Sequence, residues 1–336
     1  MSTDTRVTLL DFVLTKEPDG SLAETVELMQ QLAPILQDSH VMPANAPYGN
    51  RTTFRRSLPL VGTAKINKGV TRSKSATDQR SDVIGYFAGR SEVDSRIRKI
   101  EGDLAYARKR SDEDKSFEES LAQLVTNYFF YGDVKTDEAG FDGLHARMST
   151  LNQGTDITAS QVWSMAGGQA VVGSDGFSLD IVDWGERAAC LIFPPKTVGS
   201  LDIQDLGDIP VNDSDGNSMQ AGVTAYDWFI GLSVRDPRHI ARLANADLSD
   251  SQLDTPLQGK IFDRIESILS LMPEPGASNR VIYCPLRAYS SFLKQARTVS
   301  NLALSMAEYL GKPTPHLWGY PLRRSDQMST TESTVS

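Results

Sequence analysis

The stretch from Tyr48 to Ser75 reads YGNRTTFRRSLPLVGTAKINKGVTRSKS, and it decides how the rest of the chain is interpreted. This segment contains seven Lys or Arg residues and no Asp or Glu. The seven are Arg51, Arg55, Arg56, Lys65, Lys68, Arg72 and Lys74. Because the whole chain has a formal net charge of −9, removing these seven positive charges leaves −16 on the remainder. Positive charge is therefore concentrated in one segment of an otherwise acidic protein.

The same stretch has the composition of a long β-hairpin. Residues 51–60 are rich in Thr, Phe and Leu, which favour an extended chain. The part from Gly62 to Gly69 supplies turn residues, and residues 70–77 lead back. Pro59 lacks a backbone donor and predicts an edge strand or a break. An isolated two-stranded arm is marginally stable in water. We therefore expect the arm to lie on another surface, and the acidic part of a second copy is the obvious one.

Three interpretations of this basic run remain open from its residues alone. A run of charge is most often a solvated loop. A positively charged arm also suits a nucleic-acid-binding protein, but the acidic balance of the whole chain argues against a general nucleic-acid binder. The third interpretation is an arm that embraces an adjacent subunit, and the rest of the chain decides in its favour.

The motif TTFRRSLPL…KINKGVTRSKS resembles the extended loop of tailed-bacteriophage major capsid proteins with the Hong Kong 97-like fold. In that group, a TT-[IF]-R-x-[GS]-LP core is followed by a K-x-N-x-GV-x-x-SKS return. The second match is DWFIGLSVRDPRHIARLANAD at residues 227–247, where the family shows an aromatic residue, then GL, RD-x-R and R-[IL]-AN-x-D. The resemblance extends, at intervals, from the amino-terminal arm to about Met328.

This resemblance implies an α+β fold with an amino-terminal arm, an extended β-hairpin loop, a peripheral domain with a long spine helix, and an axial domain. The implied boundaries are an arm at 1–47, the extended loop at 48–84, a peripheral domain at 85–150 and 196–250, an axial domain at 151–195 and 251–328, and a polar tail without a fold signal at 329–336. In more familiar relatives, a hairpin like WGYPLRRSD precedes strands like YDWFIGLSV. Here that order is reversed, so we expect a rearranged strand order.

Local patterns place the main elements independently of the resemblance. Apolar residues at helical spacing predict a spine helix over about 103–131, and Gly102 followed by Asp103 predicts a break and a cap at its start. Ser21 begins a capping box for an earlier helix, and Thr255-Pro256 marks the start of a later one. Short strands fill residues 178–237, with a hairpin-turn signal at Asp215-Gly216-Asn217, and HLWGYPLRRSD at 316–326 reads as strand, turn, strand.

Acidic residues gather in the polar middle of the predicted spine helix. They are Asp112, Glu113, Asp114, Glu118 and Glu119. Their simplest interpretation is solvated charge on a helix that faces water. The resemblance favours another interpretation, in which they meet the basic loop of a neighbouring copy.

The sequence contains few patterns that indicate catalysis or the binding of a ligand or metal. No motif for phosphate, dinucleotide or zinc binding, or for a nucleophilic serine, is present. The four histidines are far apart without metal-ligand spacing, so we expect no metal and no cofactor. Cys190 and Cys284 lie in apolar contexts, which predicts buried free thiols. No stretch is apolar enough for a signal peptide or a membrane-spanning helix.

The sequence therefore predicts a non-enzymatic major capsid protein. By resemblance, it assembles with itself through hexamers and pentamers into the icosahedral shell that encloses the double-stranded DNA of a tailed bacteriophage, without binding that DNA specifically. The expected partners are further copies, a separate scaffolding protein, a portal and a cementing or decoration protein. The expected location is the virion shell, after assembly in the host cytoplasm. The alternative is a soluble α+β enzyme or nucleic-acid-binding protein with a basic arm.

Overall fold

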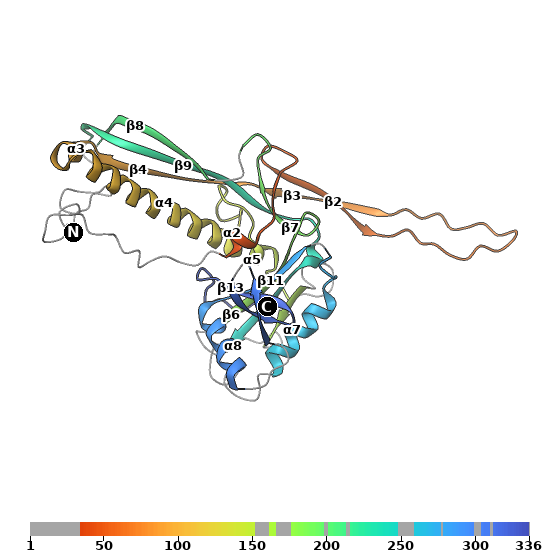
Figure 1. Cartoon of the computed structure of the whole chain (residues 1–336). Helices are drawn as coiled ribbons and strands as arrows, with labels where there is room; N and C mark the ends of the chain where they lie inside the picture. The colour runs from red at the N-terminus through yellow and green to blue at the C-terminus, as the bar shows by residue number, and fades with distance from the viewer. Residues whose placement is uncertain are drawn as a thin grey trace.

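The computed structural model describes residues 34–151, 161–165, 176–197, 201–212, 216–247, 259–276, 278–298, 304–309 and 312–335. The predicted helix at Ser21 and the predicted helix start at Thr255 lie outside these residues. Figure 1 shows a long, thin layer above a rounder lower part, and a hairpin that projects far beyond both.

Within the described residues, twelve strands form one mixed sheet. Its continuous path runs β12 (Leu304–Tyr309), β13 (Lys312–Leu317), β14 (Tyr320–Arg324), β11 (Asn279–Cys284), β6 (Gly176–Trp184), β7 (Ala189–Phe193), β9 (Ser218–Val234) and β4 (Gly85–Asp94). Four more strands join from the side: β1 (Val41–Pro43) on β7, β10 (Ile240–Asp247) on β6, β5 (Val162–Ser164) on β10, and β8 (Asp202–Asn212) on β9. The mixed α+β class predicted from the sequence is confirmed.

The 17-residue strand β9 connects the two parts of the molecule. Its residues from Ala221 to Ile230 pair with β4, and its last residues, from Gly231 to Val234, pair with β7. The predicted β8–β9 hairpin is confirmed, and Gly216 in its turn has φ +85°, a value that favours glycine. The predicted strand, turn and strand at 316–326 is also confirmed, by β13 and β14.

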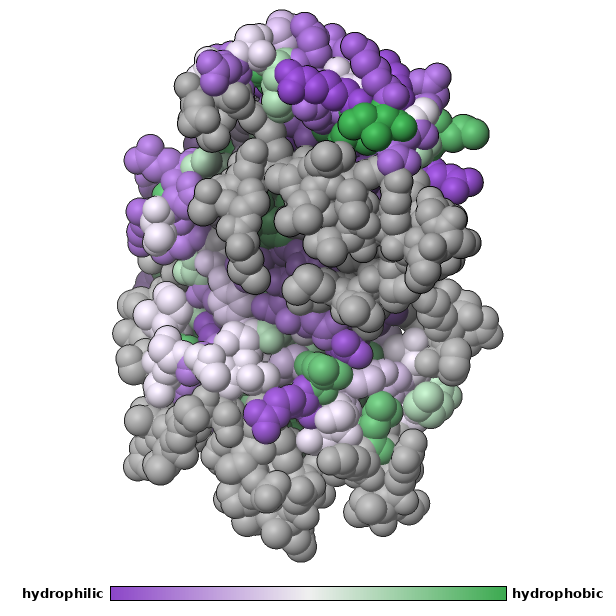
Figure 2. All heavy atoms as spheres, turned by 90° about the vertical axis from the view of Figure 1, so that its left-hand side faces the viewer, coloured by the Kyte–Doolittle hydropathy of each residue, from purple (hydrophilic) through white to green (hydrophobic). Residues whose placement is uncertain are grey.

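Helix α4 lies along one face of the thin layer formed by β4, β9 and β8 (Figure 1). It spans Asp103–Tyr131, as predicted, and is roughly 43 Å long at 1.5 Å per residue. Gly102, with φ +85°, separates it from α3 (Arg96–Glu101), and Gly102 rather than Asp103 is the cap residue. Phe117 of α4 stacks on Tyr226 of β9 with ring centroids 5.6 Å apart. Seen from the α3 end, the described surface of this layer is mainly hydrophilic (Figure 2).

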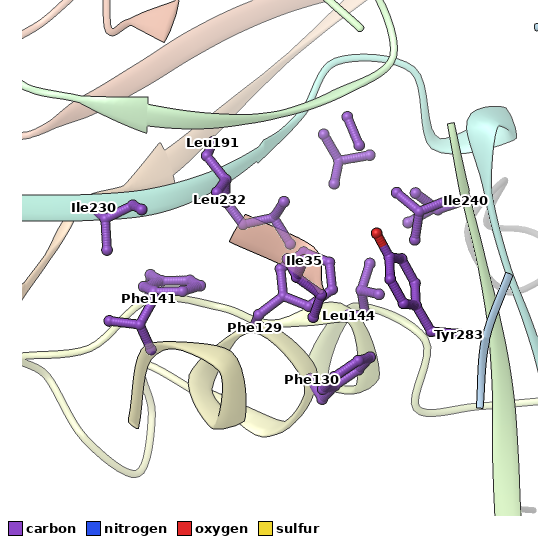
Figure 3. Close-up of a cluster of buried hydrophobic side chains, with 14 of the residues drawn as sticks. Ile35, Phe129, Phe130, Phe141, Leu144, Leu191, Ile230, Leu232, Ile240 and Tyr283 are labelled. Atoms are coloured by element: carbon purple, nitrogen blue, oxygen red, sulfur yellow. The ribbon is translucent and has the colours of Figure 1, made fainter. Parts of the chain in front are cut away.

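Two apolar clusters make most of the described core. The larger one joins the end of α4 to the sheet: Phe129 and Phe130 pack near Tyr283 of β11, and Leu191 and Leu232 lie close by (Figure 3). The second cluster packs α7 (Gly259–Leu271) and α8 (Leu286–Thr298) on the lower sheet. The other described elements are the short helices α2 (Ile35–Asp38) and α5 (Leu144–Arg147), the 3-10 turn η2 (Pro237–His239) and the two strands of the projecting hairpin. Cys190 and Cys284 are buried free thiols, as predicted.

Candidate functional site

The basic stretch forms a two-stranded hairpin that stands apart from the main sheet. Strands β2 (Gly49–Ser57) and β3 (Ala76–Val83) are antiparallel, and their pairing runs from Gly49 opposite Val83 to Ser57 opposite Ala76. Residues 58–75 continue the arm without strand structure. Figure 1 shows the arm directed away from the body of the molecule. The predicted hairpin is confirmed, with its regular part confined to the half nearest the body.

The outer half of the hairpin, residues 58–75, is called the hairpin tip here. Its large apolar side chains are exposed, and they are Leu58, Leu60, Val61, Ile66 and Val70. The predicted basic residues of the tip, Lys65, Lys68, Arg72 and Lys74, are exposed as well. The exposed fractions of Val61 and Ile66 reach 91% and 94%, so these side chains make almost no contact with their own subunit. Contiguous exposed apolar residues among charges are typical of an interaction surface.

The remaining three predicted basic residues lie on β2. The side chains of Arg51 and Arg55 are exposed, and Arg56 lies beside Arg55 in the same strand. The backbone of Arg51 is held by Asn45, whose side chain both donates to the carbonyl oxygen of Arg51 and accepts from its N–H. The hairpin therefore carries its positive charge along its whole length.

A buried polar network fixes the root of the hairpin to the body. Asn50 of β2 donates to the hydroxyl of Ser233 on β9 over 2.9 Å, and that hydroxyl donates to Asp82 of β3 over 2.8 Å. Arg147 forms an ion pair with Asp82 at 2.7 Å and also donates to the carbonyl oxygen of Leu232. Because Asp82 is 2% exposed, its charge depends on these partners. Sequence reasoning missed this network, since its members are spread over almost 200 residues.

The predicted acidic residues of α4 are largely engaged within their own subunit. Asp114 accepts a hydrogen bond from Tyr226. Each of three others has a neighbour on the same helix: Asp112 with Lys115, Glu113 with Lys109, and Glu119 with Gln123. These four residues are half-buried rather than fully in water, and Glu118 is exposed. Their contact with another copy stays a prediction.

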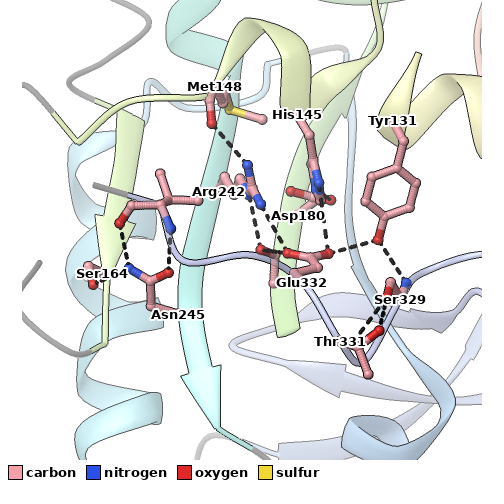
Figure 4. Close-up of polar contacts among 12 residues, drawn as sticks. Tyr131, His145, Met148, Ser164, Asp180, Arg242, Asn245, Ser329, Thr331 and Glu332 are labelled. Atoms are coloured by element: carbon pink, nitrogen blue, oxygen red, sulfur yellow. Dashed lines mark hydrogen bonds and ion pairs between the residues drawn. The ribbon is translucent and has the colours of Figure 1, made fainter. Parts of the chain in front are cut away.

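The last described residues form a second buried polar cluster, shown in Figure 4. Glu332 pairs with Arg242 of β10 at 3.0 Å and accepts hydrogen bonds from Tyr131, at 2.7 Å, and from Ser178. His145 of α5 lies 2.8 Å from Asp180, with its other ring nitrogen 3.8 Å from Glu332. Burial, and then the negative charge of Glu332, raise the pKa of Tyr131, so its hydroxyl stays protonated and donates.

The polar tail, for which the sequence has no fold signal, therefore packs against the body through Glu332 and Val335. Val335 is buried, and its backbone exchanges two hydrogen bonds with the side chain of Asn245. Asn245 adopts φ +57°, a left-handed conformation that Asn tolerates. The contact between Val335 and Asn245 could not be predicted from composition, because MSTTESTVS has no apolar periodicity.

A polar groove of about 510 Å³ borders this cluster, lined by residues that include Asn127, Ser149, Gln327 and Thr331. No group of three or more potential metal ligands occurs among the described residues. The described helices include none that is long and apolar enough to span a membrane.

The family described as "Major capsid protein GP7" matches residues 17–336. The chain belongs to this family of major capsid proteins. This capsid protein is similar to a chain in the structure of bacteriophage Epsilon15, with 25% identity and a TM-score of 0.71, and the match covers 100% of this chain and 99% of that chain. It also resembles the bacteriophage JBD30 capsid in fold, with 12% identity, a TM-score of 0.52, and coverage of 91% and 96%. No curated protein matches the chain.

As a major capsid protein, the chain is a structural subunit of a virion shell built from many copies of it. The Hong Kong 97-like fold expected from the sequence is confirmed by the two structural likenesses. In this capsid protein, the β2–β3 hairpin stands where the resemblance placed the extended loop.

Proposed function

We propose that this capsid protein builds a closed icosahedral shell of hexamers and pentamers by laying its hairpin over an adjacent copy. The observation that carries the proposal is the hairpin tip, which holds exposed apolar and cationic side chains away from its own body. Apolar surface in water is unfavourable, so covering it contributes free energy at about 25 cal/mol per Å². An adjacent copy supplies that cover with an acidic surface.

Strength in such a shell comes from repetition. One exposed ion pair contributes roughly 0.2–1 kcal/mol. Seven basic residues on each arm, multiplied over a surface in which every subunit is held by several others, make loss of a subunit rare although each contact is weak. Weak contacts also allow a misplaced subunit to leave during assembly.

The test reverses the charge of the hairpin at Arg55 and Arg56. We expect Arg55→Glu with Arg56→Glu to give a folded subunit that fails to form shells, because the arm then repels the acidic body of its neighbour. Arg187→Glu with Lys196→Glu reverses the same amount of charge at exposed turns of the body and serves as the matched control. Electron microscopy scores the shells, and circular dichroism of the subunit confirms that each variant folds.

Normal shells from the hairpin variant would overturn the role given to the arm. Sizing of the wild-type protein separates the proposal from the alternative of an enzyme or a nucleic-acid-binding protein. Shells or hexamer-sized assemblies support the proposal, and a monomer or dimer under all conditions contradicts it.

The proposal also covers the roles of the two parts of the subunit, its partners in assembly and the packaged DNA. The protein acts without catalysis, with α4 and the β4–β9–β8 layer as the peripheral domain and the α7–α8 side as the axial domain. A separate scaffolding protein guides assembly in the host cytoplasm, a portal occupies one vertex, and a decoration protein binds the outer surface. The packaged DNA contacts an acidic subunit, which favours enclosure without specific binding.

A further inference from the structure

An exposed aromatic pair lies on the thin layer of the molecule. Tyr86 of β4 stands opposite Phe229 of β9 in the strand register, and their rings stack with centroids 4.8 Å apart. Their exposed fractions are 49% and 37%. Side chains alternate along a strand, and Tyr226, three positions before Phe229, contacts α4. Tyr86 and Phe229 therefore lie on the opposite, outer face of the layer, which α4 leaves uncovered.

Two carboxylates lie beside this pair. Asp227 accepts a hydrogen bond of 2.5 Å from the hydroxyl of Tyr86, and Asp202 of β8 stands opposite Asp227 in the strand register. The N–H of Tyr86 donates to the carbonyl oxygen of Ala139, which brings the acidic loop between α4 and α5 to the same strand. That loop also contacts α4, where Asp137 accepts a hydrogen bond from Tyr128, so the carboxylates placed at the pair itself are Asp202 and Asp227. An apolar centre with a charged rim is the usual anatomy of a protein interface.

The chemistry of this patch is the complement of the hairpin tip. The tip offers exposed aliphatic side chains flanked by four cations, and the patch offers two exposed aromatic rings flanked by carboxylates. The acidic residues of α4 fit less well, because Asp112 and Glu113 are already paired with lysines of their own helix. Asp227 and Asp202 accept hydrogen bonds from the neutral groups of Tyr86 and Gln204, which leave their negative charge unbalanced. Charge complementarity therefore favours the outer face over the helix.

In this structure the hairpin of the same subunit leaves the aromatic pair uncovered. The β2–β3 ladder holds both strands extended from the root outward. At about 3.3 Å per residue, the tip is carried on the order of 50 Å from Tyr86, which follows the root directly. The tip therefore stands away from the aromatic pair of its own subunit in this structure. Figure 1 shows the hairpin and β4 extending in opposite directions from the root.

We propose that the outer face around Tyr86 and Phe229 is the acceptor for the hairpin tip of a second copy of this chain. In this arrangement, apolar side chains such as Ile66 cover the aromatic pair, and Lys65 and Lys68 approach Asp202 and Asp227. The proposal rests on the proposed function and adds the surface to which the arm binds.

Disulfide trapping tests this assignment. The chain's own thiols, Cys190 and Cys284, are buried, so engineered pairs react without competition. Phe229→Cys is combined in turn with cysteine at Leu60, Val61, Ile66 and Val70, and shells are oxidised after assembly. A disulfide closes only where two Cα atoms approach within about 7 Å. We expect at least one combination to shift the chain from monomer to covalent multimers on a denaturing gel without reductant.

The controls separate the possible failures. Glu118→Cys with the same tip positions tests the helix as the acceptor, and each single cysteine variant sets the background. Shells that form without any crosslink to Phe229→Cys would overturn the acceptor and leave the proposed function intact. Absence of shells from the wild-type chain would instead contradict the proposed function.

A charge exchange gives an independent readout that does not depend on cysteine. Lys65→Glu with Lys68→Glu is expected to reduce the yield of shells, and Asp202→Lys with Asp227→Lys in the same chain is expected to restore it. In the matched control, Asp202→Lys and Asp227→Lys are combined with Arg187→Glu and Lys196→Glu, which reverse the charge of two residues outside the hairpin tip. Failure of the acceptor substitutions to restore any shells would count against the proposal.

Discussion

Arg242 and Glu332, 90 residues apart in the sequence, form an ion pair of 3.0 Å in which both side chains are more than nine-tenths buried. An exposed pair of this kind contributes little to stability, but removal of one member of a buried pair leaves an uncompensated charge in the core. The pair therefore ties the C-terminal residues to β10 and, through Tyr131, to the end of α4.

We predict that Glu332→Ala strongly destabilises the unassembled subunit. Arg242 then keeps its charge in a buried site without its carboxylate, and the expected loss is on the order of 3–5 kcal/mol in the free energy of unfolding. Urea unfolding followed by circular dichroism measures it. Glu186→Ala is the control, because Glu186 is 72% exposed and lies 3.9 Å from Arg235. Equal losses for the two variants would contradict the prediction.

The root of the hairpin gives a second prediction. Arg147→Ala leaves the buried carboxylate of Asp82 without its cation, so the attachment of β3 to β9 weakens. We expect backbone amides of β2 and β3 to lose protection in hydrogen exchange, while amides of β6 and β11 keep theirs. Arg90→Ala removes a more exposed pair, with Glu92, and should leave the hairpin amides unchanged. Uniform loss of protection across the whole chain would argue against a local role.

A third prediction concerns the thermal stability of the subunit at low pH. The hydrogen bond from Arg110 lowers the pKa of Asp205 below its usual range. A carboxylate with a lowered folded pKa contributes stability above its unfolded pKa, about 3.9, and that contribution disappears as the pH falls through the folded pKa. Asp205→Asn should therefore melt below the wild type at neutral pH, and the difference should shrink below about pH 4. Thermal unfolding across that range checks it.

Asp103→Asn is the control for the acid prediction, because its carboxylate is 89% exposed and its nearest cation, on Arg98, lies 3.6 Å away. We expect this variant to differ little from the wild type at any pH. A melting difference for Asp205→Asn that stays constant with pH would contradict the assignment of the effect to this carboxylate.

Close backbone packing gives a fourth prediction. A Cβ added at Gly143 would lie 2.4 Å from the carbonyl oxygen of Tyr128 and 2.7 Å from that of Phe129. Since both neighbours are backbone atoms at the end of α4, we expect Gly143→Ala to destabilise the subunit by about 1–3 kcal/mol. Gly62→Ala, which would meet nothing within 4 Å in the hairpin tip, should leave the unfolding midpoint unchanged.

Local sequence patterns predicted the elements that define this fold. Helical spacing of apolar residues such as Phe117 and Leu121 predicted α4, and Gly102 marked its start. The predicted apolar stripe is only partly correct, because Leu124 is exposed and Val125 is buried. The hairpin was predicted from its turn residues, and its distinct charge from the absence of Asp and Glu. Its strand-like stretch at residues 51–60 ends at Ser57, since Pro59 cannot continue the ladder.

Long-range polar contacts could not be predicted from one sequence. Nothing near Asp82 points to Arg147, and nothing near Glu332 points to Arg242, because such pairs depend on how distant strands come together. For the same reason, the acidic residues of α4 looked available to a neighbour, although Asp114 accepts a hydrogen bond from Tyr226 of its own subunit. The aromatic pair of Tyr86 and Phe229 likewise needed the register of β4 against β9.

The regular pairing of β2 with β3 ends at Ser57 and Ala76, well short of the turn at Asn67. Beyond that point, no ladder of cross-strand hydrogen bonds stiffens the chain, whereas the inner half is clamped to the body. A curved enclosure made from identical pieces has to join them at more than one angle. In the assembly proposed above, the outer segment without a ladder would adjust to each angle, while the hydrogen-bonded base would hold each arm in one direction.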